Sequence, residues 1–166
     1  ITQTSFFADS SLISSGAITG WQWDFGNGNN STQQNPQQVY DSAGVYYITL
    51  ITTSGFGCSD TTIGSTVIFP KPVSSFTANS DSSCTYPVSV GFTNASTGAT
   101  IYNWTFGNGD SSAVLSPTVL YDTSGNYLVT LIVSNQFGCS DTSSSVYTVY
   151  PIPHADFTVS AMQGCQ

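Results

Sequence analysis

The chain has 166 residues, nine acidic side chains, a single lysine (Lys71) and a single histidine (His154), so its formal net charge is −8. Proteins bind nucleic acids largely through lysine and arginine, whose charges displace the counterions of the phosphate backbone. Phosphate-handling enzymes need the same cations or a helix N-terminus. No apolar run approaches the about 18 residues that a membrane-spanning helix requires. The composition therefore excludes nucleic acid as a partner and insertion into a membrane.

Aromatic residues make up 13% of the chain and charged residues only 6%. Residues that favour strands are abundant, whereas good helix formers such as glutamate and arginine are scarce or absent. Ten phenylalanines, nine tyrosines and three tryptophans are enough to fill packed cores. The composition predicts an all-β protein.

The first element with a clear signature is an aromatic strand that ends in WDFGNGN at residues 23–29, and it returns as WTFGNGD at residues 104–110. Asp-Phe-Gly is also the metal-binding triplet of protein kinases, and spaced glycines occur in nucleotide-binding loops. However, the second copy has Thr105 in place of Asp24, and the glycines lead into more strand rather than into a helix. The motif is therefore interpreted as a strand that turns through Asn-Gly into a two-residue hairpin, with each tryptophan in or near the core.

A tyrosine and then a glycine-led strand of alternating pattern follow each motif. In the first copy these positions are Tyr40, Gly44 and Tyr46, and the second copy repeats them 81 residues later at Tyr121, Gly125 and Tyr127. A glycine two residues before a tyrosine is typical of a corner that precedes a strand. We expect the tyrosine hydroxyl to bond to the backbone of that turn.

These residues resemble the repeats of the polycystic kidney disease, or PKD, family, in which a W-D-F-G-(D/N)-G motif precedes a tyrosine and a Gly-x-Tyr strand. The matching residues are Trp23, Phe25, Gly26, Gly28, Tyr40, Gly44 and Tyr46 in the first copy, and Trp104, Phe106, Gly107, Gly109, Tyr121, Gly125 and Tyr127 in the second. The resemblance implies an all-β fold of tandem immunoglobulin-like β-sandwiches, each with about seven strands in two packed sheets. The repeated Gly-Cys-Ser-Asp-Thr segment further resembles PKD arrays in giant surface proteins and adhesins of Bacteroidota.

The copies also define the expected domain boundaries. We expect a first sandwich over residues 1–70, whose first strand is supplied by a preceding repeat, and a second sandwich over residues 73–151. Residues 154–166 are interpreted as the first strand of a following repeat. Proline pairs at residues 70–72 and 151–153 are expected to stiffen the links.

The two ends of the chain match each other when they are joined. Phe7 would then follow Cys165 by eight residues, the spacing that separates Phe92 from Cys84. The match indicates that the chain is one stretch of a longer array of repeats, cut at an arbitrary strand boundary. No signal peptide is visible, so we expect a mature chain or an excerpt of one.

Four cysteines recur at the repeat spacing: Cys58, Cys84, Cys139 and Cys165. No Cys-x-x-Cys pair or histidine cluster accompanies them, so disulfides in an oxidising compartment are expected rather than a zinc site. In an immunoglobulin-like sandwich, the loop with Cys84 should lie at the opposite end from the loops with Cys58 or Cys139. This arrangement favours bonds across the junctions between copies, but the three pairings within the chain remain open.

The sequence predicts no catalytic residue and no cofactor. His154, the only histidine, follows a proline in a link, and the first copy has Val73 in its place. Some PKD domains bind calcium, so the resemblance implies weak calcium candidates among oxygen-bearing residues beside the motif, namely Asp24, Asn29 and Asp110.

The predicted function is a non-catalytic spacer or stalk repeat of a long extracellular filament or cell-surface adhesin. Its expected partners are neighbouring copies of the same repeat, other filament chains, and surface glycans or proteins. The alternative is a carbohydrate-binding or spacer accessory module of a secreted hydrolase. In that case exposed tyrosines would contact the polysaccharide. Tyr47, Tyr102, Tyr147 and Tyr150 are candidates, but of these only Tyr47 is expected on a flat sheet face.

Overall fold

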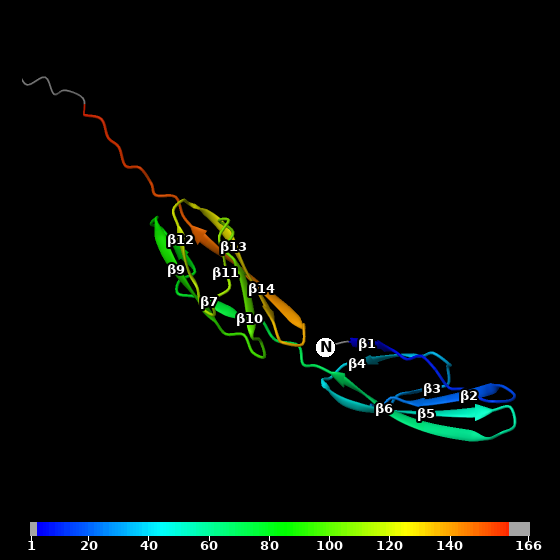
Figure 1. Ribbon diagram of the computed structural model, residues 1–166. Helices are drawn as coiled ribbons and strands as arrows, with labels where there is room; N and C mark the ends of the chain where they lie inside the picture. Colours follow the sequence, from blue (N-terminus) through cyan, green and yellow to red (C-terminus); the bar gives the residue numbers. More distant parts are fainter. Residues whose placement is uncertain (1–2, 160–166) are drawn as a thin grey trace, which may run out of the picture. The chain divides into compact units, whose positions relative to one another are not determined.

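A computed structural model describes residues 3–159 and contains fourteen strands and no helix over that range. The chain divides into two compact units (Figure 1). Unit 1 comprises the described residues up to Lys71 together with Phe137–Cys139, and unit 2 comprises the remaining described residues. Over this range no helix is long and apolar enough to cross a membrane. The prediction of an all-β fold is confirmed.

Unit 1 is built from two sheets. One sheet pairs β1 with β4, and the other has the order β3-β2-β5-β6. The strands are β1 (Gln3–Phe6), β2 (Ile18–Asp24), β3 (Asn30–Ser31), β4 (Gln37–Tyr40), β5 (Gly44–Ser54) and β6 (Ser59–Ile68). Alternate side chains of these strands meet between the sheets and form a core of Trp23, Phe25, Tyr40, Ile48, Leu50 and Ile68.

Unit 2 repeats this arrangement and adds two strands. Its sheets have the orders β12-β9-β7 and β11-β10-β13-β14-β8. The strands are β7 (Phe76–Ala78), β8 (Ser82–Ser83), β9 (Val88–Asn94), β10 (Ile101–Thr105), β11 (Ser111–Ser112), β12 (Thr118–Tyr121), β13 (Gly125–Ser134) and β14 (Ser140–Val149). The core is larger and consists of Val90, Phe92, Trp104, Phe106, Val119, Tyr121, Val129, Leu131, Val133, Tyr147 and Val149.

Backbone bonds fix which strands of the two units correspond. The Phe7 nitrogen donates to the Pro36 oxygen and the Phe92 nitrogen to the Pro117 oxygen, both at 2.9 Å. The segment around β1 is therefore the counterpart of β9, and β4 that of β12. Strands β7 and β8, which pair with β9 and β14, have no counterpart in unit 1 among the described residues.

The motif does not form the two-residue Asn-Gly hairpin that we expected from the sequence. Strand β2 ends at Asp24 and β3 begins at Asn30, so five residues connect them. A two-residue turn of the Asn-Gly type needs a positive φ at the asparagine as well as at the glycine. Among the described residues only glycines have a positive φ, including Gly26 (72°) and Gly28 (87°). The Asn27 side chain instead accepts a bond from the Asn29 nitrogen at 3.2 Å.

Candidate functional site

The motif residues bind one another and the neighbouring loop. In unit 1 the Trp23 indole donates to the Gln33 oxygen at 3.0 Å, and the Tyr40 hydroxyl donates to the Phe25 oxygen at 3.1 Å. Unit 2 repeats both bonds, from Trp104 to Val114 at 3.0 Å and from Tyr121 to Phe106 at 3.0 Å. Burial raises the pKa of the Tyr40 and Tyr121 phenols. These hydroxyls therefore stay protonated and act as donors inside the fold.

The first glycine of each motif lies against the backbone of the next long strand. A Cβ atom added to Gly26 would lie 2.5 Å from the Tyr47 oxygen, and one added to Gly107 would lie 2.7 Å from the Leu128 nitrogen. Nothing lies within 4 Å of the same position on Gly28 or Gly109. The close approach and the positive φ together explain Gly26 and Gly107, because only glycine satisfies both constraints.

A tyrosine corner follows in each unit. The Tyr46 hydroxyl donates to the Ser42 oxygen at 3.0 Å, and the Tyr127 hydroxyl donates to the Thr123 oxygen at 2.9 Å. The rings of these tyrosines pack on Tyr40 and Tyr121, with centroids 4.3 and 4.2 Å apart. Each corner therefore ties the turn before the strand to the core tyrosine.

The three calcium candidates are exposed and take part in local turns. The Asp24 carboxylate accepts the Gly26 nitrogen at 2.9 Å, and the Asp110 carboxylate accepts the Asn108 side-chain amide at 2.8 Å. Asn29 lies in the same loop as Asp24, whereas Asp110 belongs to the equivalent loop of unit 2. Residues 3–159 contain no group of three His, Cys, Asp or Glu side chains that could hold a metal ion. Calcium binding therefore stays a prediction.

Asp9 makes a set of bonds that the sequence did not reveal. Its carboxylate accepts the Trp21 indole at 2.7 Å, the Ser11 nitrogen at 2.9 Å and the Gln34 amide at 3.2 Å. Burial acts to raise its pKa, but these hydrogen bonds outweigh it and lower the pKa to about 2. The second copy has Asn94 at this position, so no repeated acidic residue marked the site.

The cysteines lie at strand ends. Cys58 and Cys139 immediately precede β6 and β14, and Cys84 directly follows β8. In unit 2, β8 pairs with Thr148 and Val149 at the far end of β14 from Cys139. The ten residues of β14 span about 30 Å, far beyond the about 7 Å that a disulfide tolerates between Cα atoms.

A disulfide between Cys84 and Cys139 of one chain is therefore excluded. No disulfide joins the three cysteines within the described range. Cys165 lies outside the described residues. Pairing between copies remains a prediction.

The tyrosines considered for glycan binding do not form one exposed platform. Tyr147 is only 2% exposed and stacks on Tyr121 at 5.4 Å, so it is wrong as a candidate for contact with a polysaccharide. Tyr102 is partly buried and donates its hydroxyl to the Ala99 oxygen at 3.1 Å. Tyr47 and Tyr150 are exposed, but they belong to different units.

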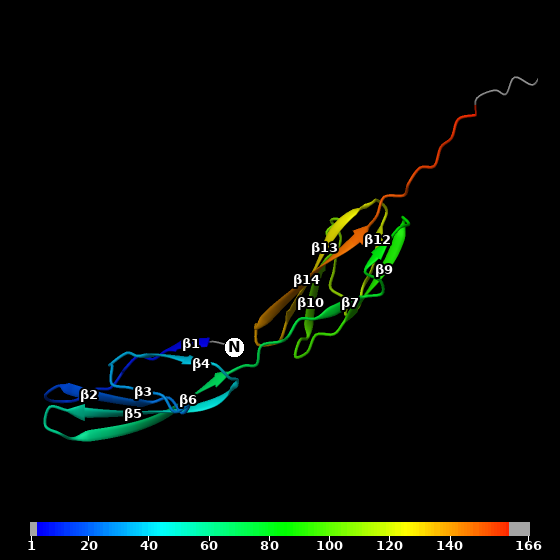
Figure 2. The ribbon, with the colours of Figure 1, turned by 180° about the vertical axis from the view of Figure 1, so that it is seen from behind.

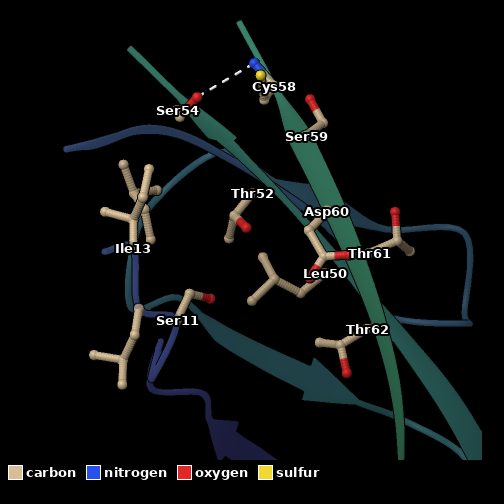
Figure 3. A pocket seen from close by; sticks show the side chains of 12 residues that line it. Ser11, Ile13, Leu50, Thr52, Ser54, Cys58, Ser59, Asp60, Thr61 and Thr62 are labelled. Atoms are coloured by element: carbon tan, nitrogen blue, oxygen red, sulfur yellow. Dashed lines mark hydrogen bonds between the residues drawn. The ribbon is translucent and has the colours of Figure 1, made fainter. Parts of the chain in front are cut away.

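Unit 1 carries two hollows along the edge of its core. The first, of about 500 Å³, lies between Phe7, Trp23 and residues 62–65 of β6. The second, of about 290 Å³, lies between the loop at residues 11–13 and strands β5 and β6. Figure 3 shows Leu50 and Thr52 of β5 and Ile13 of the loop lining this second space. The first hollow exposes the core side chains Trp23, Ile48 and Leu50. The second is lined mainly by serine and threonine side chains, together with Leu50, Cys58 and Asp60.

The arrangement defines a class of protein: immunoglobulin-like β-sandwiches in tandem, in which the shared residues form cores, turns and corners. The family profile of the PKD domain matches residues 1–68 and 70–149. The chain therefore belongs to the PKD domain family.

Parts of the chain are similar to parts of larger proteins. The pre-pro-metalloprotease PrtV of Vibrio cholerae serotype O1 is 45% identical over 53 residues, which are 32% of this chain and 6% of PrtV. Collagenase ColQ1 of Bacillus cereus (strain Q1) is 44% identical over 46 residues, which are 28% of this chain and 5% of the collagenase. The chain thus spans only a small fraction of these relatives.

Two solved PKD domains are also similar. The crystal structure of the PKD1 domain of V. cholerae PrtV has 34% sequence identity, covers 48% of this chain and 98% of its own, and has a TM-score of 0.41. The PKD1 domain of Vibrio anguillarum Epp has 30% identity, covers 51% and 98% of the two chains, and has a TM-score of 0.43.

Proposed function

We propose that this chain is a spacer repeat of a long extracellular filament or cell-surface adhesin, with no catalytic activity of its own. The supporting observation is that the residues shared by the two copies make core and turn contacts. The tryptophan, the core tyrosine and the corner tyrosine of each motif all donate to backbone carbonyls of their own unit. A repeated reactive site would present the same polar groups in both units, whereas Asp60 faces an open hollow in unit 1 and its counterpart Asp141 accepts the Ser74 nitrogen in unit 2.

The proposed mechanism is mechanical. Each copy buries its own aromatic core, so the length of the protein grows with the number of copies. Proline at positions 70 and 72 fixes two φ angles of the link and limits its freedom. A net charge of −8 with a single lysine disfavours adhesion between stalks that lie side by side.

An extracellular location is part of this proposal. It is supported by the similarity to PrtV, a pre-pro-metalloprotease with a PKD1 domain, and to a collagenase. The proposed partners are neighbouring copies of the repeat and other filament chains, with surface glycans or proteins as targets of the complete assembly.

The same relatives favour a second candidate, an accessory module of a secreted hydrolase. The burial of Tyr147 weakens the case for an accessory module that binds carbohydrate. It does not affect the case for an accessory module that acts as a spacer. The two candidates differ in what adjoins the chain. A spacer array continues into further PKD copies, whereas an accessory module adjoins a catalytic domain.

Electron microscopy of the native particle, together with the sequence of its complete polypeptide, tests the proposal. We expect a regular fibre or stalk whose polypeptide holds many PKD copies. A compact enzyme with one or two PKD domains beside a catalytic domain would reject the spacer array and favour the accessory module.

A further inference from the structure

The two units differ at one edge of the sandwich. In unit 2, β9 pairs with β12 on one side and with β7 on the other, where Phe76 lies opposite Asn94 and Ala78 opposite Phe92. In unit 1, the corresponding strand β1 pairs with β4, and no strand within residues 3–159 pairs with its other edge. Within the described residues, unit 1 thus has an unpaired sheet edge where unit 2 has β7.

The core of unit 1 is also incomplete at this edge. In unit 2 the Phe76 ring packs edge-on against Trp104 at 5.1 Å and Phe92 at 6.0 Å. Unit 1 has the matching rings, Phe7 and Trp23, 5.7 Å apart, but the described residues place no counterpart of the Phe76 ring against them. A hollow of about 500 Å³ lies at this place, and it is larger than the hollow of about 320 Å³ that remains beside Phe76 and Ala78 in unit 2. Accordingly Phe7 is only partly buried, whereas Phe92 is 2% exposed.

The second hollow corresponds to the path of the chain just before β7. In unit 2 the Ser74 nitrogen donates to Asp141 at 2.8 Å and its hydroxyl donates to the Leu131 oxygen at 3.1 Å. The equivalent residues of unit 1, Asp60 and Leu50, line the open space in Figure 3. The linings of the two hollows share Ser11, Leu50 and Thr62, so we treat them as one site for a segment like residues 74–78 and call it the acceptor groove.

The C-terminal segment has the sequence that the groove lacks. Phe157 and Val159 are the counterparts of Phe76 and Ala78, yet they are 83% and 79% exposed and belong to no strand. This segment extends away from the sandwich of unit 2 (Figures 1 and 2). Phe157 follows the end of β14 by eight residues, as Phe76 follows the end of β6. We call residues 154–159 the donor segment.

We propose that the donor segment of a second copy of this chain enters the acceptor groove and pairs antiparallel with the open edge beside β1. The register of β7 on β9 places Phe157 opposite Asp9, Thr158 opposite Ala8 and Val159 opposite Phe7. The Phe157 ring then fills the space beside Phe7 and Trp23. The added strand gains main-chain hydrogen bonds and buries two apolar side chains, as in other strand-addition complexes.

This interface is heterologous, because the groove and the donor segment are different surfaces of the same chain. Each bound copy presents a further donor segment, so the contact extends head to tail instead of closing at a dimer. The inference goes beyond the spacer function. If the chain does not self-associate, the proposed strand addition is rejected, but the spacer function is not affected.

Sedimentation velocity of the 166-residue chain over a range of concentrations tests the interface. We expect oligomers whose mean size grows with concentration. Phe157→Ser removes the ring that fills the groove, so it should weaken association by about a hundredfold. Phe157 is exposed within its own chain, so folding should not change.

A variant of the groove gives the complementary test. The nitrogens of Phe7 and Asp9 donate to Pro36 and Asn35, so the Ala8 nitrogen between them points to the open edge. Ala8→Pro removes this donor and blocks pairing at the edge, whereas proline is tolerated on edge strands. Each variant alone should be monomeric. A mixture of Ala8→Pro, which keeps its donor segment, with Phe157→Ser, which keeps its groove, should form a one-to-one dimer.

Ile152→Ser is the matched control. It removes an exposed apolar side chain from the same terminal region, but its counterpart Lys71 is charged, so this position does not require an apolar group. The control should associate like the parent chain. Three results would overturn the proposal. The first is a parent chain that is monomeric at every concentration. The others are equal weakening of association by Ile152→Ser and Phe157→Ser, and association that survives Phe157→Ser. If Ala8→Pro fails to fold, the comparison of Phe157→Ser with the parent chain still tests whether the donor segment mediates association.

Discussion

Gly107 and Gly109 lie two residues apart in the same loop, but they have different constraints. Both have a positive φ, at 77° and 98°. Only Gly107 faces a close backbone neighbour, because an added Cβ atom would lie 2.7 Å from the Leu128 nitrogen. Their shared sequence pattern therefore conceals two physical requirements, one of conformation and one of space.

Alanine at these two positions should separate the requirements. Gly109→Ala should cost about 1 kcal/mol of unfolding free energy, the strain of a left-handed alanine. Gly107→Ala adds a clash with backbone atoms that cannot rotate away, so it should cost about 3 kcal/mol. Urea unfolding followed by tryptophan fluorescence measures both in the transition of unit 2, which Trp104 reports, while Trp21 and Trp23 report unit 1. Equal effects would contradict the role assigned to the Leu128 contact.

Asp9 should make the stability of unit 1 depend on pH. Its pKa is lowered from 3.8 to about 2 in the fold, so the folded state binds fewer protons than the unfolded state in this range. The contribution is therefore fully present above pH 3.8 and is lost as the pH falls through about 2. Asp9→Asn introduces the residue that unit 2 has at Asn94. Its cost in urea midpoint should be greatest near pH 5 and should shrink toward pH 2, whereas a cost independent of pH would count against the assignment.

Strand β7 contributes more to the core than its three residues suggest. Its Phe76 ring contacts both Phe92 and Trp104, and these rings continue the stack to Phe106. Phe76→Ala should therefore destabilise unit 2 by about 3 kcal/mol. Urea unfolding followed by Trp104 fluorescence measures the loss. Phe157→Ala is the control for the same change at an exposed counterpart, and a similar loss there in a monomeric sample would refute the assignment.

The long central strands were predictable from the sequence because they alternate. Ile48 and Leu50 of β5 recur as Val129 and Leu131 of β13, and all four are core residues. Strand β14 has no such pattern, because serines and threonines occupy both of its faces along most of its length. The burial of Tyr147 therefore depends on pairing and packing that the local sequence does not encode.

The turn after β2 shows a different limit of sequence reasoning. Asn-Gly indicates a reversal of the chain but not the length of the connection. The length of the connection, five residues, follows from the register in which Trp23 of β2 pairs with Ser31 of β3. The Asp9 cluster was equally hidden, since its partners Trp21 and Gln34 are distant in sequence.

The two units should unfold separately, and unit 1 should unfold first. Within the described residues, unit 1 has six buried core residues, whereas unit 2 has eleven and the additional strand β7. Calorimetry of the monomeric chain should show two transitions. Gly107→Ala should lower the later one only, which assigns it to unit 2. A single transition, or an earlier transition that responds to this substitution, would contradict the separate cores.

Single-molecule pulling from the two ends of the chain most directly tests whether the copies act as independent mechanical elements in series. Unit 1 holds strands from Gln3 to Ile68 and unit 2 from Phe76 to Val149. Each should resist force and then release its chain in a separate event of roughly 200 Å. Two distinct force peaks are the predicted result. One merged event, or extension without any force peak, would contradict the account.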